Sequence, residues 1–289
     1  MFQSYLWNRL AADAFASREQ PYFVFAESDN GAAIIPAIID TDSKTLGFAG
    51  ERLFDYRDYL AVGDSEALKR AWQRLGALSL PISITAINRP DGLIWESLPK
   101  TRFSGAPQLM NREIAPEDFA RSHVRAFSRL RKLERMGFQI QQCSGNSSVV
   151  RWIYESRACQ HDGDELFRDS HRLEFMAAIA REMGSSCEVF ALERAGTLAA
   201  ALVTFRDGNF RRFYTTYYDQ DWARYSPGVS LLFEIARRTL EQGLSFDLMT
   251  GEQSYKMRIA PTAQPLFQVN ASAGQLRQLV SESLCDVAA

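Results

Sequence analysis

The chain has 289 residues, which is enough for one large domain or two ordinary ones. Hydrophobic residues make up 46% of it and charged residues 24%, proportions that are typical of a folded globular protein. The formal net charge of −2 gives the chain as a whole no attraction to nucleic acid or to anionic membranes, so nucleic acid is not an expected partner.

The cysteines and histidines do not form a recognisable site. The 4 cysteines lack Cys-x-x-Cys spacing, and His123, His161 and His171 lack the spacing of metal ligands. We therefore expect no disulfide framework and no metal. No apolar run reaches the roughly 20 residues that span a bilayer, and the N-terminus does not resemble a secretory signal. A cytoplasmic protein with no membrane span is the expectation.

The first part of the chain predicts a small unit with antiparallel strands. A helix is expected over residues 2–15, and apolar segments 21–27 and 31–40 flank Asp29-Asn30-Gly31, a strong hairpin signal. A third strand is expected near 45–49. Asp64 is the expected N-cap of a helix that continues to about residue 78, and residues 80–87 alternate like a strand.

The second part predicts a longer series of elements. Ala115-Pro116 begins a helix that continues to about Met136 and is ended by Gly137. The further helices are expected at 148–160, 170–183 and 229–242, and the strands at 138–144, 187–194, 197–206, 209–218, 245–249 and 266–270. Both parts follow the order helix, antiparallel strands, helix, strand. We expect an α/β (α+β) protein with domains at 1–114 and 115–289.

The turn from Tyr225 to Ser230 is a candidate anion site. Pro227 and Gly228 precede an amphipathic helix whose first backbone N–H groups have no helical partner, and Ser230 adds a hydroxyl in the first turn. A diphosphate here would accept several N–H bonds and lie at the positive end of the helix dipole. The alternative is an ordinary capped helix start, because Pro, Gly and Ser are common there.

Residues 218–261 carry a more specific pattern. Its residues are Tyr218-Asp219, Ser226-Pro227-Gly228, Gly243, Phe246-Asp247, Gly251-Glu252 and Tyr255-Lys256. This pattern resembles the acyltransferase domain of the CelD-like proteins, which are named for association with cellulose biosynthesis. They are a branch of the GNAT N-acyltransferase superfamily close to the FemAB-like enzymes. A basic helix at 125–137 and a strand at 197–205 extend the resemblance to about 119–261.

The resemblance implies a GNAT-like fold, as a tandem of two GNAT-like units of which the N-terminal one is degenerate. It implies acyl-CoA as co-substrate, with the diphosphate on Ser226, Gly228, Val229 and Ser230 and the pantetheine arm beside a splayed strand that includes Thr215 and Tyr217. The usual GNAT loop is Gln/Arg-x-x-Gly-x-Gly/Ala, and only its middle glycine matches here. The donor is therefore left open between acetyl-CoA, a longer acyl-CoA and another activated donor.

Acyl transfer to an amine needs a base, a donor to the oxyanion and an acid for the thiolate. A strand N–H near Thr215–Tyr217 could be the hydrogen-bond donor to the oxyanion. By resemblance Tyr255 is the acid, and Lys256 would supply positive charge; the alternative is that Tyr255 packs and Lys256 is solvated. The candidate bases are Asp219, Asp247 and Glu252. Asp247 lies in an apolar strand, so an ion pair with Lys256 or Arg258 is its structural alternative, and Glu252 is also explained as a helix cap.

A basic stripe lies on the helix that begins at Pro116. Its members are Arg121, Arg125, Arg129 and Lys132, opposite an apolar face. Such a stripe can bind a phosphate, an anionic glycan or RNA, and it can also be a solvated surface.

The function expected from these features is an N-acyltransferase that moves an acyl group from acyl-CoA to an amine by direct attack. The acceptor is a small-molecule or glycan amine, with amino sugar, amino acid and protein lysine all open. One alternative is FemAB-like aminoacyl transfer from aminoacyl-tRNA. Another is a non-catalytic GNAT-like subunit in polysaccharide assembly. Acyl chain length and oligomeric state are not fixed by the sequence.

Overall fold

The structure is a computed structural model that describes residues 1–53, 56–88, 98–143, 145–160 and 165–278. Contacts divide the chain into unit 1, Met1–Gly105 together with the chain from Gln264 onward, and unit 2, Ala106–Ala263. Each unit is described by itself. Among the described residues, no helix combines the length and the apolar character needed to cross a membrane.

Unit 1 is a mixed sheet with the helices α1 (Tyr5–Ala14) and α2 (Glu66–Ala77) and a helical segment at residues 273–278. Its strands are β1 (Glu19–Ser28), β2 (Gly31–Asp40), β3 (Leu46–Phe48), β4 (Leu60–Gly63), β5 (Ile82–Ile87), the first part of β6 (Lys100–Leu109) and most of β12 (Thr262–Ala271). The strand order is β1-β2-β3-β5-β12-β6, and β4 also pairs with β2. The C-terminal strand was assigned to the second domain from sequence, but contacts group it with unit 1 because β12 pairs antiparallel with β5.

The local features of unit 1 follow the sequence closely. β1 and β2 pair from Glu19↔Asp40 to Ser28↔Gly31, which confirms the hairpin around Asp29-Asn30. The expected cap of α2 is displaced by one residue: Ser65 is the N-cap, while the Asp64 carboxylate accepts a hydrogen bond of 3.1 Å from the Glu66 amide. The apolar side of α2 packs on β1 and β2, and its Trp72 is fully buried.

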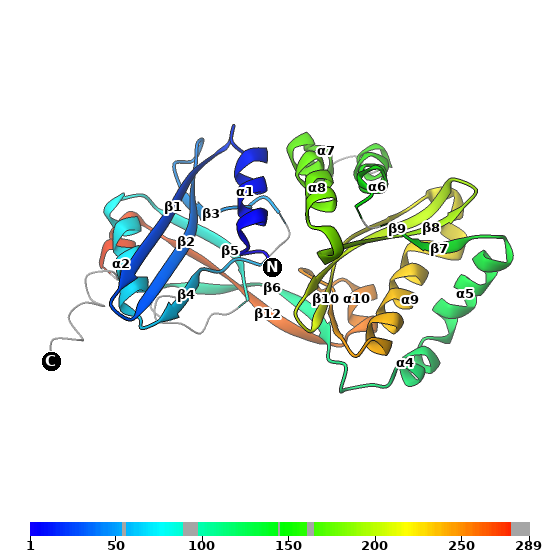
Figure 1. Ribbon diagram of the computed structural model, residues 1–289. Coiled ribbons are helices and arrows are strands. Elements are labelled where there is room, and N and C mark those ends of the chain that lie inside the picture. The colour runs from blue at the N-terminus through cyan, green and yellow to red at the C-terminus, as the bar shows by residue number, and fades with distance from the viewer. Residues whose placement is uncertain (54–55, 89–97, 144, 161–164, 279–289) are drawn as a thin grey trace. The chain divides into compact units, whose positions relative to one another are not determined.

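Unit 2 has a sheet with helices on both faces (Figure 1). Its elements are the last part of β6, α4 (Pro116–Ser122), α5 (Val124–Arg135), β7 (Gln139–Gln142), α6 (Ser147–Gln160), α7 (Glu165–Arg168), α8 (Ser170–Glu182), η1 (Gly184–Ser186), β8 (Cys187–Arg194), β9 (Thr197–Asp207), β10 (Phe210–Tyr218), η2 (Gln220–Tyr225), α9 (Pro227–Glu241), β11 (Ser245–Asp247) and α10 (Ser254–Ile259). The strand order is β6-β11-β10-β9-β8-β7. The two faces differ in their cover, because α5 and α9 pack on one and α6 and α8 on the other.

The expected single helix from residue 115 to 136 is two helices. His123 breaks it with φ −123° and ψ 33°. Its ring nitrogens lie 2.8 Å from the Phe119 carbonyl oxygen and 3.1 Å from that of Arg258. The His123 side chain therefore connects the end of α4 with the end of α10. The end of the second helix is as expected, because Gly137 takes φ +89°, a value that side chains rarely permit.

The meander β8-β9-β10 forms the middle of the unit 2 sheet. Its two antiparallel pairings, Cys187↔Phe205 to Arg194↔Thr197 and Phe210↔Asp207 to Tyr218↔Ala200, confirm the strands expected there. On the α9 side, Leu202, Phe213 and Phe246 join the buried core of this unit. This packed layer fixes where β10 ends and where α9 begins.

Candidate functional site

The first turn of α9 leaves backbone donors without helical partners. Ser226 precedes it in the left-handed conformation, with φ 49°, and Pro227 is the first helical residue. No side chain caps the helix. The Ser230 amide donates to the Ser226 carbonyl at 3.0 Å, and the amides of Gly228 and Val229 come before the first helical hydrogen bond. These two amides, rather than that of Ser230, lack a partner within the helix; Val229 lines a cavity, whereas Gly228 is buried.

Gly228 serves helix–strand packing. A Cβ at this position would lie 3.3 Å from Cδ1 and 3.4 Å from Cβ of Tyr218 in β10, so a side chain would press on that strand. The left-handed residue of the turn is Ser226, one residue before Pro227. The hydroxyl of Ser230 is buried and has no hydrogen-bond partner, so it faces the helix packing and not an open surface.

An arginine-rich cavity adjoins this turn. The Arg129 guanidinium donates to the Ser226 hydroxyl at 3.2 Å, across 97 positions of sequence. The cavity has a volume of about 440 Å³, and Val229 and Phe233 of α9 form part of its wall. Its basic lining residues are Arg121, Arg125, Arg129 and Arg258. The cavity, the Val229 amide and the helix dipole together suit a phosphate-bearing group.

Strands β10 and β11 pair only over a short length. The parallel register includes Phe210↔Ser245, Arg211↔Phe246 and Arg212↔Asp247, and β11 then ends. β10 continues to Tyr218 with β9 as its neighbour on one side. Along residues 213–218 the other edge of β10 has no strand partner within the described parts of the chain. Alternate N–H groups on that edge can therefore serve a ligand.

Thr215 and Tyr217 lie on the part of β10 that pairs with β9 on one edge and has no described strand partner on the other. Both are nearly fully buried, and the Thr215 hydroxyl has no hydrogen-bond partner. The Tyr217 ring lies 6.2 Å from the Trp152 ring of α6, which places Tyr217 on the face that α6 covers. Burial raises the pKa of Tyr217. Asp219 follows as the N-cap of η2, and its carboxylate accepts from the Asp221 amide at 2.9 Å.

Asp247 is fully buried and has three donors. Its carboxylate accepts from the Arg212 guanidinium at 2.5 Å, from the Gln108 amide group at 3.2 Å and from the Met249 backbone amide at 2.7 Å. The expected ion pair of this residue with Lys256 or Arg258 is instead made with Arg212 of the adjacent strand. This arrangement favours a structural role for Asp247.

Lys256 closes the turn after β11. Its ammonium group donates to the Thr250 carbonyl at 2.8 Å and lies 3.4 Å from the Met249 carbonyl. Burial lowers the pKa of Lys256 to about 8, and the charge of Asp247 opposes that shift. Lys256 is therefore positively charged on most molecules at pH 7 and has a fixed position, unlike the solvated lysine that the sequence left open.

Tyr255 packs against the unit 2 core while its phenol stays protonated. It is partly buried, and burial raises its pKa, an effect that the nearby Arg157 reduces. Arg157 also opposes the rise in the pKa of Tyr217, so this arginine of α6 lies near both tyrosines. Glu252 is exposed, close in sequence to the start of α10.

The predicted residues form two groups. Val229 lines the arginine cavity and Ser226 contacts its Arg129, whereas Gly228 is buried; Tyr217 and Tyr255 lie around Arg157. Sequence reasoning missed the roles of Arg157, Arg212 and Arg258, because each acts through a partner on another element; only the stripe that contains Arg129 gave a signal. His161 lies outside the described residues, and within those residues no three His, Cys, Asp or Glu side chains are grouped to hold a metal ion.

Comparison with known proteins finds a family match within the second unit. Residues 118–257 match the family described as an acetyltransferase (GNAT) domain. No curated protein matches the chain in sequence.

Three solved structures are similar in fold. The C-terminal domain of a putative lysylphosphatidylglycerol synthetase from Agrobacterium fabrum has a TM-score of 0.60 and 12% identity, over 96% of this chain and 95% of that one. FemX has a TM-score of 0.57 and 10% identity, over 96% and 94% of the two chains. A tandem GNAT protein from the clavulanic acid biosynthesis pathway has a TM-score of 0.50 and 10% identity, over 92% and 88%. The chain therefore has a mixed α/β, GNAT-like fold, and its residues 118–257 match an acetyltransferase (GNAT) domain.

Proposed function

We propose that this acyltransferase moves an acyl group from acyl-CoA to an amine, by direct attack of the amine on the thioester, in the cytoplasm. The observation that carries the proposal is the position of the Arg129 guanidinium, which contacts Ser226 at the start of α9 and lines the same cavity as Val229. Backbone N–H groups and a guanidinium are the donors that a diphosphate requires.

The donor residues fit acyl-CoA in charge and in space. The diphosphate would lie at the first turn of α9, beside the Val229 amide, and a further phosphate would find arginines around the cavity of about 440 Å³. The thioester arm would follow the edge of β10 that is left unpaired after Arg212↔Asp247. Acetyl-CoA and longer acyl-CoA molecules carry the same phosphates, so these contacts give no selectivity for acyl chain length.

The remaining residues would assist the chemistry in separate ways. An N–H on the open edge of β10, near Thr215, would donate to the oxyanion that forms on the thioester carbonyl. Tyr255, which stays protonated because burial raises its pKa, would donate a proton to the departing thiolate. The Lys256 charge would favour that thiolate. Asp219 and Glu252 remain the candidates to accept the proton of the amine.

The acceptor is proposed by resemblance. The pattern shared with CelD-like proteins, at Ser226-Pro227-Gly228 and Gly251-Glu252, makes an amine on a glycan or on one of its precursors the first class to test. Amino acids and protein lysines remain further candidates.

Calorimetric titration with CoA tests the donor site. Gly228 is a poor place for a variant because its Cβ would meet Tyr218. Val229→Glu places a carboxylate at the helix start, and Val229→Gln is its neutral control of similar size. We expect Val229→Glu to weaken CoA binding at least about tenfold by repulsion, and Val229→Gln to change it less than about threefold. Equal CoA binding by the wild type and Val229→Glu would remove the assigned site.

A second candidate is aminoacyl transfer from aminoacyl-tRNA. The number of arginines around one cavity favours it, because Arg121, Arg125 and Arg258 join Arg129 there. The fold likeness to FemX is compatible with it. This reading predicts salt-sensitive binding of tRNA together with no measurable affinity for CoA. Tight CoA binding without tRNA binding would exclude it.

A further inference from the structure

Unit 1 contains a buried carboxylate that is poorly satisfied by hydrogen bonds. Glu19, the first residue of β1, is 1% exposed, and neither of its carboxylate oxygens has a hydrogen-bond partner of ordinary geometry, although the Gly50 amide lies near enough to oppose the rise in its pKa. Its ion-pair contact is the Nε of Arg52 at 3.9 Å, beyond hydrogen-bond range. A carboxylate in this condition is costly to bury, so an additional donor is expected to offset the cost.

The neighbouring carboxylates of Asp40 and Glu51 each accept hydrogen bonds from the protein through at least one oxygen. Asp40 accepts from the amide and hydroxyl of Ser43 at 2.8 and 2.9 Å and from Arg52 at 3.0 Å. Glu51 accepts from the amide and hydroxyl of Thr85 at 2.9 and 2.5 Å. It also lies 3.4 Å from the Nε of Arg57. Glu19 therefore differs from the acids around it.

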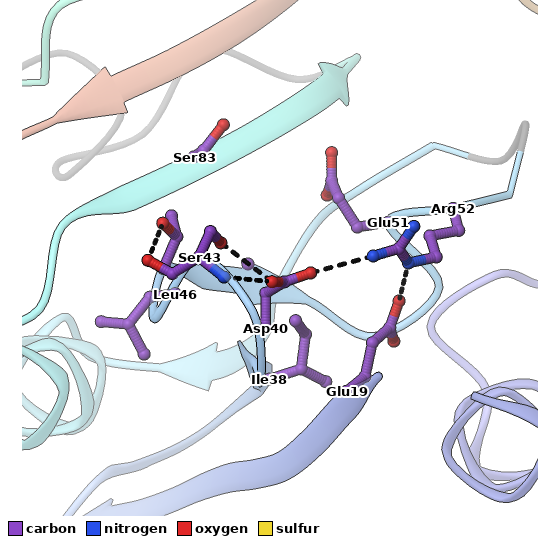
Figure 2. Close-up of a pocket in the computed structure, with 10 residues that line it drawn as sticks. Glu19, Ile38, Asp40, Ser43, Leu46, Glu51, Arg52 and Ser83 are labelled. Carbon is purple, nitrogen blue, oxygen red and sulfur yellow. Dashed lines mark hydrogen bonds and ion pairs between the residues drawn. The ribbon is translucent and has the colours of Figure 1, made fainter. Parts of the chain in front are cut away.

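Glu19 lines a pocket of about 280 Å³ (Figure 2). Figure 2 shows the carboxylates of Glu19 and Asp40 directed toward the guanidinium of Arg52. The other lining residues are Ile38, Ser43, Thr45, Leu46, Gly47, Glu51 and Ser83. The lining thus combines carboxylates, hydroxyls and a small apolar wall.

The charges around Glu19 leave room for one more cation. Three acids face the pocket, Glu19, Asp40 and Glu51, and the basic groups that face them are Arg52 and Arg57. Burial raises the pKa of Glu19 to about 7, against the opposing influence of the Gly50 amide, Arg52 and Arg57. Two guanidinium groups therefore do not compensate this carboxylate fully.

We propose that the pocket beside Glu19 binds a small polyhydroxylated primary amine, with its ammonium group on the Glu19 carboxylate. An ammonium group carries three N–H donors, and it can donate to both carboxylate oxygens of Glu19. Among the described residues these acids are not grouped to hold a metal ion, which favours an organic cation. The hydroxyls of Ser43, Thr45 and Ser83 suit ligand hydroxyls, and the volume suits a molecule of about ten non-hydrogen atoms, since a water occupies about 30 Å³.

This site lies within unit 1 and does not depend on which donor unit 2 uses. Its test is calorimetric titration of the full chain at pH 8 with D-glucamine, and with sorbitol, in which a hydroxyl replaces the ammonium group. We expect saturable binding of D-glucamine and none of sorbitol. Glu19→Gln should weaken binding at least about tenfold. Glu27→Gln, an exposed residue of the same strand, should leave binding unchanged.

The pH dependence of the wild type provides a measurement without a variant. D-Glucamine keeps its charge at pH 6 and pH 8, as a lysine does, whereas about nine tenths of the Glu19 carboxyls are ionised at pH 8 and about one tenth at pH 6. Binding should therefore be about ninefold weaker at pH 6. If Glu19→Gln does not fold, the ratio of the wild-type affinities for D-glucamine at pH 8 and pH 6 tests the proposal.

Three results would each overturn the proposal. They are equal binding of sorbitol and D-glucamine, the absence of saturable D-glucamine binding, and equal affinity at pH 6 and pH 8. A loss of affinity in Glu27→Gln as large as that in Glu19→Gln would also count against it, because it would reveal a diffuse charge effect.

Discussion

The fully buried carboxylate of Asp247 accepts a hydrogen bond of 2.5 Å from the Arg212 guanidinium, at the last paired position of β10 and β11. Beyond this pair β11 ends, while β10 continues to Tyr218. The ion pair therefore lies where the open edge of β10 begins. Arg212 also contacts Asp207 at 2.7 Å, so the guanidinium is held between two acids.

We expect Asp247→Asn to destabilise the protein by about 3 kcal/mol, because it leaves the Arg212 charge with one partner in a buried place. Asp207→Asn is the matched control, and it should cost less because Asp207 is partly exposed. Urea unfolding at pH 7 measures both. A variant Asp247→Asn with wild-type stability but acyl transfer reduced more than about 100-fold would instead make Asp247 a catalytic base.

Arg129→Ala should weaken CoA binding about tenfold, because it removes the guanidinium beside Ser226 at the start of α9. Arg131→Ala lies on the same helix outside the cavity and should change affinity less than about twofold. Calorimetry at two salt concentrations separates a local contact from general attraction. If the two variants bind CoA equally, the phosphate site lies elsewhere.

Tyr255→Phe should reduce kcat about 100-fold or more once an amine acceptor is available, because the phenol that donates to the thiolate is absent. The free energy of unfolding should fall by less than about 1 kcal/mol, since the ring still packs on the core. Steady-state rates of CoA release and urea unfolding are the two measurements. Unchanged kcat with lowered stability would assign Tyr255 to packing alone.

Lys256 should make stability rise with pH in the alkaline range. Below about pH 8 it is charged in both folded and unfolded chains; between about 8 and 10.5 the folded form loses its proton first. The unfolded state then binds more protons, so the free energy of unfolding rises, by at most about 3 kcal/mol. Lys256→Met should lack this rise, while Lys132→Met, an exposed control, should keep it. Identical slopes in all three proteins would contradict the lowered pKa.

Glu19 should have the opposite effect in acid. Below about pH 4.5 its carboxyl is protonated in both states, and up to about pH 7 only the folded form keeps the proton. Stability from this group is therefore lost as the pH rises from 4.5 to 7, by at most about 3 kcal/mol. Glu19→Gln should show a smaller fall than the wild type in urea unfolding across that range. Glu27→Gln should behave as the wild type does; a wild-type fall in Glu19→Gln would disprove the assignment.

Much of the fold could be predicted from local signals. The Asp29-Asn30-Gly31 hairpin, the meander at 187–218 and the end of the basic helix at Gly137 have their expected places. Turn residues and apolar periodicity depend on a few neighbouring positions, so the structure that they specify can be predicted from the sequence. The break at His123 could not, because it depends on a contact with the Arg258 carbonyl.

The candidate site was predicted in part. The start of α9 and the Tyr255-Lys256 pair came from the pattern of residues, but the sequence left Asp247 open as a base. The structure puts the left-handed residue at Ser226 and pairs Asp247 with Arg212. Such partners lie far apart along the chain, and no local pattern encodes them.

The sequence by itself determined the order of most elements, the α/β class and the position of the helix start at α9, because each depends on neighbouring residues. Only the tertiary structure decided that Arg129 reaches Ser226 and that Glu19 is buried without a hydrogen bond of ordinary geometry. It also decided that β12 pairs with β5. These outcomes depend on how helices and strands pack, and packing is set by the shape and burial of many distant side chains together.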